Sequence, residues 1–261
     1  MTTIERTAEL RSAFLKIGWA PLVTICGVIL LCIIAIVIAV ITASTIDDGL
    51  STMKIIITGS SLITLAGYFL TYAGFAQAQK AFGATKAGEA LSTLKIIFLI
   101  FTIIGAATFF LMLLLPDRTE AYLHIAENAS ENPDTVRAIG GVFIILYLLM
   151  SIYSLVALFI IKSKTKKLAA STNIRALNSA YTGALMGVIT FFASLVTGVV
   201  SGLTAGGNEP SLIPLLCELF TLGIAIYALV KWIGGWLGAA TEVMRHEVEA
   251  AEYNDRYTLT D

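Results

Sequence analysis

Six long apolar runs constrain this chain more than any other feature of its sequence. A helix that crosses the apolar core of a bilayer, about 30 Å thick, needs roughly 20 mostly apolar residues. The runs are continuous and lack the alternation that is typical of a membrane β-strand. They lie approximately at Pro21–Ser44, Ile55–Gln77, Leu94–Leu115, Ile139–Ile161, Ala180–Leu203 and Leu212–Trp232. The sequence therefore predicts an all-α, polytopic membrane protein with six transmembrane helices.

The overall composition agrees with a surface that faces lipid. Hydrophobic residues make up 57% of the chain and charged residues 13%, and the mean hydropathy is +0.86. Soluble domains carry about 25% charged residues. Because so few charges cannot cover a water-exposed surface, an ordinary soluble protein is excluded.

The basic residues set the expected orientation in the membrane. Cytoplasmic loops of membrane proteins carry an excess of Lys and Arg. With six spans, 14 of the 17 basic residues fall on the side that holds both termini, and only Lys54, Arg118 and Arg137 fall on the other. We therefore expect an integral membrane protein whose N- and C-termini are both cytoplasmic.

The segments outside the apolar runs complete the expected domain organisation. Residues 1–19 are predicted to form a cytoplasmic amphipathic helix, residues 20–239 the six-helix transmembrane domain, and residues 240–261 a cytoplasmic C-terminal amphipathic helix and tail. The long third connection contains helix-compatible residues at Arg118–Asn128, which predict a short helix on the outer surface.

Apolar side chains indicate where the flanking helices lie. Leu10, Phe14 and Ile17 recur at three- and four-residue steps, which predicts a helix that lies along the membrane surface. Trp232 and Trp236 fall where the last span is expected to reach the inner interface, a position that favours tryptophan.

Two of the predicted hairpins share a short pattern. Lys80 with Ala90-Leu91 aligns with Lys166 and Ala176-Leu177 at an offset of 86 residues. The matches indicate either a duplicated two-helix hairpin or the chance similarity that apolar composition produces.

The first and fifth apolar runs differ in character. The first is almost purely aliphatic from Val28 to Ile41, so we expect it to face lipid. The fifth carries a stripe of small residues, and small residues at such spacing let helix backbones approach closely. The stripe predicts packing within the protein or between subunits, and its members include Gly183, Gly187, Ser194 and Gly198.

A polar face and one carboxylate are the candidates for an ion or proton site. Glu218 is the only carboxylate inside an apolar run, about 9 Å along its helix from the outer end. Ionisable groups at such depth usually face the protein interior or water. We expect Glu218 to face the interior near the hydroxyl groups on one face of the second span, which carries Ser61, Thr64, Tyr68, Thr71 and Tyr72.

Motifs for catalysis are missing from the sequence. No His/Cys group has zinc spacing, and Glu242 with His246 is too small a set to make a metal site. We expect no enzyme activity, no cofactor and no metal. The expected partners are membrane lipids and either a second copy of the chain or another subunit of a membrane complex; nucleic acid is not expected.

Two functions remain open from the sequence. The first is a non-enzymatic membrane protein that acts as a scaffold or as a subunit of an assembly. The alternative is a small transporter or channel for a cation or proton, which would use Glu218 and the polar face of the second span.

Overall fold

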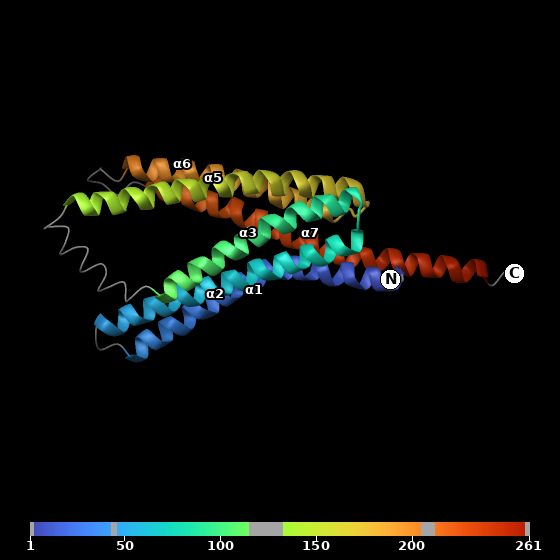
Figure 1. Ribbon diagram of the computed structural model, residues 1–261, viewed down its shortest axis with the longest axis horizontal. Coiled ribbons are helices and arrows are strands. Elements are labelled where there is room, and N and C mark those ends of the chain that lie inside the picture. Colours follow the sequence, from blue (N-terminus) through green and yellow to red (C-terminus); the bar gives the residue numbers. More distant parts are fainter. Residues whose placement is uncertain (1–2, 43–45, 115–132, 205–211, 259–261) are drawn as a thin grey trace. The chain divides into compact units, whose positions relative to one another are not determined.

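The structure is a computed structural model that describes residues 3–42, 46–114, 133–204 and 212–258 (Figure 1). These residues form helices and, within the described ranges, no strand. The predicted outer helix, Arg118–Asn128, lies outside the described residues. The helices are α1 (Thr3–Thr42), α2 (Ile46–Phe82), α3 (Lys86–Leu114), α5 (Pro133–Thr172), α6 (Leu177–Thr204) and α7 (Leu212–Thr258).

Five of these helices are long and apolar enough to cross a membrane. Few of the residues in the most apolar part of each segment are buried in the structure, as a lipid-facing surface requires. The all-helical fold is thus that of a helical membrane protein. Five of the six predicted runs overlap these segments, and the sixth, Ile55–Gln77, lies in α2. The apolar segments are Arg6–Val37, Lys86–Phe110, Leu148–Thr172, Leu177–Thr204 and Leu212–Arg245.

The chain divides into two compact units. Unit 1 consists of Met1–Pro21, Leu70–Ile97 and Leu155–Asp261, and unit 2 consists of Leu22–Phe69 and Phe98–Ser154. Apart from Ala35, all the buried apolar residues among those described belong to unit 1. The well-packed core of the described chain is therefore the core of unit 1.

Unit 2 has many exposed aliphatic side chains among its described residues. On α1, Ile29 is 54% exposed and Ile36 is 61% exposed, which agrees with the expectation that the first apolar run faces lipid. Aromatic rings join the other helices of this unit. The ring of Phe101 lies 5.4 Å from that of Tyr68 and 5.5 Å from that of Tyr153, measured between centroids.

Unit 1 contains two helical hairpins, α2–α3 and α5–α6, that turn in a similar way. A residue with positive φ follows the first helix of each: Gly83 at 59° and Asn173 at 55°. Glycine and asparagine are the residues that adopt this conformation at least cost. The left-handed residue therefore ends α2 and α5 in the same manner.

The two hairpins also share a pattern of burial. Positions 90 residues apart, the separation of Gly83 and Asn173, are buried in both, so the structural equivalence differs from the offset of 86 that the sequence alone indicates. The equivalent buried pairs are Thr71 and Ile161, Phe75 and Thr165, Ala78 and Leu168, Ala87 and Leu177, and Ala90 and Ala180.

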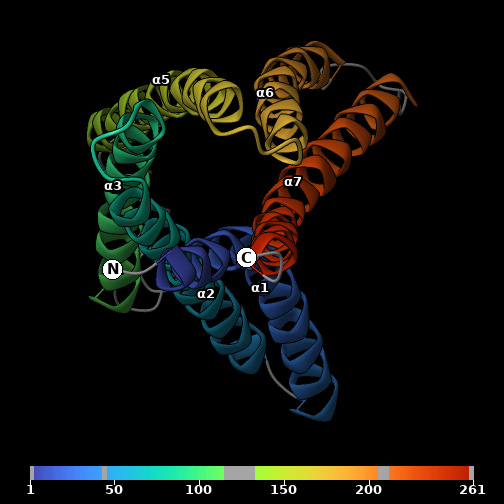
Figure 2. The same ribbon diagram turned by 90° about the vertical axis from the view of Figure 1, so that its right-hand side faces the viewer.

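The N-terminal segment differs from the expected surface helix. It continues without a break through Pro21 into the first apolar run, as one helix. Leu10, Phe14 and Ile17 are buried in unit 1, so their apolar face packs on protein and not on lipid. Figure 2 shows this part of α1 beside α7, and a Cβ added to Gly18 would lie 2.7 Å from Leu237 Cδ2.

Candidate functional site

Helices α6 and α7 pack with their backbones in direct contact. A Cβ atom added to Gly183 of α6 would lie 2.5 Å from the backbone nitrogen of Trp232 and 2.7 Å from the carbonyl oxygen of Ala228. One added to Gly235 of α7 would lie 2.6 Å from the Cα atom of Ala180. Gly183 of α6 lies at the closest approach of α7, and Gly235 of α7 lies at the closest approach of α6. Because glycine has no side chain, the two backbones come into direct contact at these positions.

Polar contacts hold the same pair of helices in register. The carboxylate of Glu242 on α7 accepts hydrogen bonds from the backbone N–H groups of Arg175 (3.0 Å) and Ala176 (2.9 Å), which immediately precede α6. The hydroxyl of Ser179 donates to the carbonyl oxygen of Lys231 (3.2 Å). The first N–H groups of a helix lack partners within it and carry partial positive charge, so a carboxylate is well suited to this position.

Replacing Glu242 by alanine is expected to cost about 1 kcal/mol of stability. The substitution removes both acceptors, and loss of a side-chain cap at a helix start costs about 0.5–2 kcal/mol. Thermal unfolding in detergent would measure the change. Glu218→Ala, which removes an exposed carboxylate from the same helix, is the matched control. Equal unfolding temperatures for the two variants would contradict the anchoring role of Glu242.

An aromatic cluster fills the centre of unit 1. Trp236 of α7 is fully buried. Its ring lies 5.6 Å from that of Phe14 on α1, 5.4 Å from that of Phe75 on α2 and 5.5 Å from that of Trp232, measured between centroids. The expectation that Trp236 lies at the lipid interface is therefore corrected. A tryptophan near the end of a span suits the interface, but here protein from two other helices covers the ring.

A cleft of about 760 Å³, lined by both polar and apolar residues, opens between the α2–α3 turn and the end of α5. The side chains of Lys86 and Lys167 and the hydroxyls of Thr85 and Ser171 line it, together with Glu89. The backbone N–H of Gly88 donates to Thr85 Oγ1 (3.2 Å), which caps α3. The cleft offers the ammonium groups of Lys86 and Lys167 as hydrogen-bond donors, whereas the Ser171 hydroxyl donates to the carbonyl oxygen of Leu168 in its own helix (3.2 Å).

The predicted ion-site residues belong to different units. Ser61, Thr64 and Tyr68 lie in unit 2, whereas Thr71 and Glu218 lie in unit 1. Thr71 is buried. The Glu218 side chain is exposed on α7, which differs from the expectation that it faces the interior.

Two of the hydroxyl groups on the polar face of α2, those of Ser61 and Thr64, bond within their own helix. Ser61 Oγ donates to the carbonyl oxygen of Thr58 (2.7 Å) and Thr64 Oγ1 to that of Ser60 (2.8 Å). Such bonding satisfies the donor without a neighbouring helix or water. These side chains therefore do not require a polar pathway.

The stripe of small residues on α6 has two different halves. Gly183 lies against α7 as described above, whereas a Cβ on Gly187 would meet only Leu158 Cδ2, at 3.6 Å, an ordinary contact. Ser194 is exposed and donates to the carbonyl oxygen of Thr190 (2.9 Å). A Cβ on Gly198 would have no neighbour within 4 Å. Close helix packing is thus confined to the basic-side half of the stripe.

Sequence reasoning missed the anchoring carboxylate of Glu242, which had stood only as a weak metal-ligand candidate with His246. The acceptor role depends on the nearness of α7 to the α5–α6 turn, which no local pattern encodes. Among the described residues, no group of three or more His, Cys, Asp and Glu could hold a metal ion.

Comparison with protein-family models, with curated proteins and with solved structures gives no match for this chain.

Proposed function

We propose that this protein is a non-enzymatic integral membrane protein that acts as a scaffold or as a subunit of a membrane assembly. In this proposal α2 supplies a sixth span, and both termini lie in the cytoplasm. Unit 1, which contains the basic α2–α3 and α5–α6 turns, is the part that receives a partner.

The observation that carries the proposal is the concentration of the core in unit 1. The start of α1, the α2–α3 hairpin, the end of α5, and both α6 and α7 contribute to this unit. The indole of Trp236 packs against rings of α1 and α2, and the glycine contacts bring the backbones of α6 and α7 together. Interiors packed to this degree resist deformation. A rigid unit that presents a cleft with both polar and apolar lining is suited to binding another protein.

The alternative, transport of a cation or proton, has less support. Its main residue, Glu218, is exposed on α7, and the hydroxyls of Ser61 and Thr64 on α2 are satisfied by their own helix. An interhelical bond near Glu218 also has a packing role, since Thr197 Oγ1 and Thr221 Oγ1 lie 2.9 Å apart and join α6 to α7. Polar groups in a bilayer commonly hold helices together in this way.

Photo-cross-linking in native membranes tests the scaffold proposal. A photoreactive residue at Lys86 or at Ser171, both in the cleft, is expected to form a discrete adduct with another protein. The same residue at Ile36, an exposed position on α1, is the control and should yield lipid adducts alone. Absence of a protein adduct at the cleft would contradict the proposal. So would a cation or proton flux through the reconstituted protein that Glu218→Gln abolishes.

Cysteine labelling tests the proposed orientation. In a background without Cys26, Cys32 and Cys217, new cysteines at Lys166 and Arg256 are expected to react only with reagents added from the cytoplasmic side. A cysteine at Glu127 should react only from the outside. The expectation follows from the distribution of Lys and Arg. Labelling of Lys166→Cys and Glu127→Cys from the same side would overturn the six-span arrangement.

A further inference from the structure

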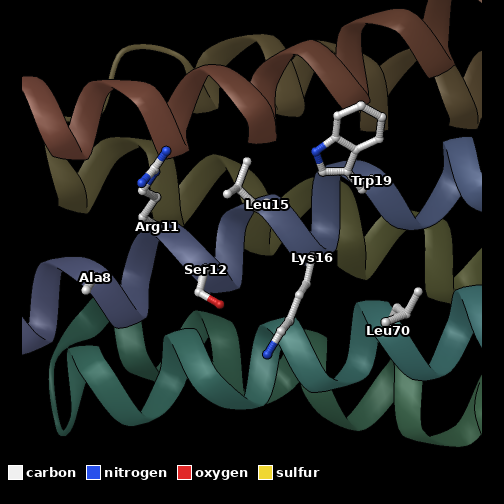
Figure 3. A pocket seen from close by; sticks show the side chains of 7 residues that line it. All are labelled: Ala8, Arg11, Ser12, Leu15, Lys16, Trp19 and Leu70. Carbon is white, nitrogen blue, oxygen red and sulfur yellow. The ribbon is translucent and has the colours of Figure 1, made fainter.

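A second cavity, of about 390 Å³, lies beside the first part of α1 (Figure 3). Its lining belongs entirely to unit 1 and combines basic, hydroxyl and apolar side chains. The residues that matter are Arg11, Ser12, Leu15, Lys16 and Trp19 of α1 and Leu70 of α2.

The polar part of this cavity suits an anion. Arg11 and Lys16 both line it, and none of the described residues that line it is an Asp or a Glu. The Lys16 ammonium donates to Gln77 Oε1 (2.7 Å), which fixes its position against α2. An ammonium has three N–H donors and a guanidinium has five. Figure 3 shows the two head groups at opposite edges of the cavity. After the bond to Gln77, each retains N–H donors for a phosphate group that lies between them.

The apolar part of the cavity suits a hydrocarbon chain. Trp19 is 52% exposed. In Figure 3 Leu15 points to the same side of α1 as Trp19, and Leu70 lines the cavity from the other side, on α2. Arg11 and Trp19 are eight residues apart, or about 12 Å along a helix. Tryptophan favours the level of lipid headgroups, where its ring contacts both polar and apolar groups. The cavity also borders the apolar segment of α1, Arg6–Val37.

We propose that this cavity binds one anionic phospholipid. Arg11 and Lys16 hold the phosphate, Ser12 donates to it, and Trp19 and Leu70 contact the glycerol region and the upper part of an acyl chain. A free phosphate ion would use the basic residues but would leave the apolar lining without a role. This lipid site is independent of the scaffold proposal, because a scaffold and a transporter could both contain it.

Quenching of Trp19 fluorescence by brominated lipids tests this site directly. The chain has three tryptophans, so Trp232→Phe/Trp236→Phe leaves Trp19 as the only reporter in the full-length protein. The protein would be reconstituted into vesicles that contain brominated phosphatidylglycerol or brominated phosphatidylcholine at equal mole fraction. Two basic residues at a membrane surface are worth up to about 30-fold in affinity for anionic lipid. We expect the affinity of the site for brominated phosphatidylglycerol, measured by quenching of Trp19, to be at least about 10-fold higher than that for brominated phosphatidylcholine.

Charge variants distinguish binding of the lipid in the cavity from general attraction of anionic lipid to the basic residues of the protein. Arg11→Gln/Lys16→Gln should reduce the preference to about 1, and Arg11→Lys/Lys16→Arg should retain it because both charges remain. Arg6→Gln/Lys80→Gln removes two exposed charges from the same unit outside the cavity and should change the preference less than about twofold. Equal loss in both Gln pairs, or no preference in the reporter protein, would overturn the proposal.

Two further measurements complete the test. Millimolar glycerol phosphate, which has the headgroup chemistry without the chains, should leave the quenching unchanged; displacement of the brominated lipid by it would make the cavity an anion site and overturn the lipid assignment. If the reporter background fails to fold, native mass spectrometry of the wild-type protein replaces it. One retained phosphatidylglycerol that Arg11→Gln/Lys16→Gln releases supports the site, and unchanged retention rejects it.

Discussion

Replacing Gly183 by leucine is expected to force α6 away from α7 and to cost about 1–3 kcal/mol or more of stability. The new Cβ would lie 2.5 Å from the backbone nitrogen of Trp232 and 2.7 Å from the carbonyl oxygen of Ala228. These atoms belong to a helix backbone and cannot rotate away as the end of a side chain can. Relief of the overlap therefore requires movement of a whole helix. Thermal unfolding in detergent, followed by circular dichroism, would measure the loss.

Gly198→Leu is the matched control for this substitution. It lies on the same helix, and a Cβ there would have no neighbour within 4 Å. Because leucine favours a helix over glycine by up to about 1 kcal/mol, the control should be neutral or slightly stabilising. Gly235→Leu approaches the same contact from α7 and should resemble Gly183→Leu. If Gly198→Leu were as damaging as Gly183→Leu, the cost would belong to the whole small-residue stripe and not to the α6–α7 contact.

The membrane-crossing helices were predictable because their signal is local and large. A run of about 20 apolar residues has few structural solutions, and five of the six runs overlap apolar helices in the structure. The helix ends were less predictable. The apolar runs mark where lipid contact ends, whereas helical hydrogen bonding continues through polar residues. Thus α1 begins at Thr3 and α7 extends to Thr258.

The direction in which side chains face was harder to predict, since neither hydropathy nor spacing distinguishes lipid from protein as an apolar neighbour. Leu10 and Trp236 are compatible with either, and in the structure other helices cover both. Glu218 is the opposite case. The cost of a charge in hydrocarbon favoured an interior position, but its side chain is exposed. The small-residue stripe predicted close packing, yet only contact with α7 distinguishes Gly183 from Gly198.

Substitution of Trp236 by alanine is expected to have the largest effect of any single change, a loss of about 3–5 kcal/mol of stability. The indole is fully buried and contacts the rings of Phe14, Phe75 and Trp232. Its removal would leave a cavity where α1, α2 and α7 meet, and helix backbones in direct contact elsewhere in the unit would limit relaxation into it. Unfolding in detergent should therefore occur at a much lower temperature than for the wild-type protein.

Trp236→Phe separates the packing role of this side chain from its polar atom. The indole Nε1 is buried and has no hydrogen-bond partner, and a buried donor without a partner costs about 1–3 kcal/mol. Phenylalanine loses part of the ring volume but also removes this donor, so the two effects oppose each other. We expect a stability within about 1 kcal/mol of the wild-type protein, in clear contrast to Trp236→Ala. If Trp236→Phe were instead as unstable as Trp236→Ala, the Nε1–H group would have to contribute a favourable interaction in the membrane. The aromatic cluster would then be held together by a hydrogen bond as well as by packing.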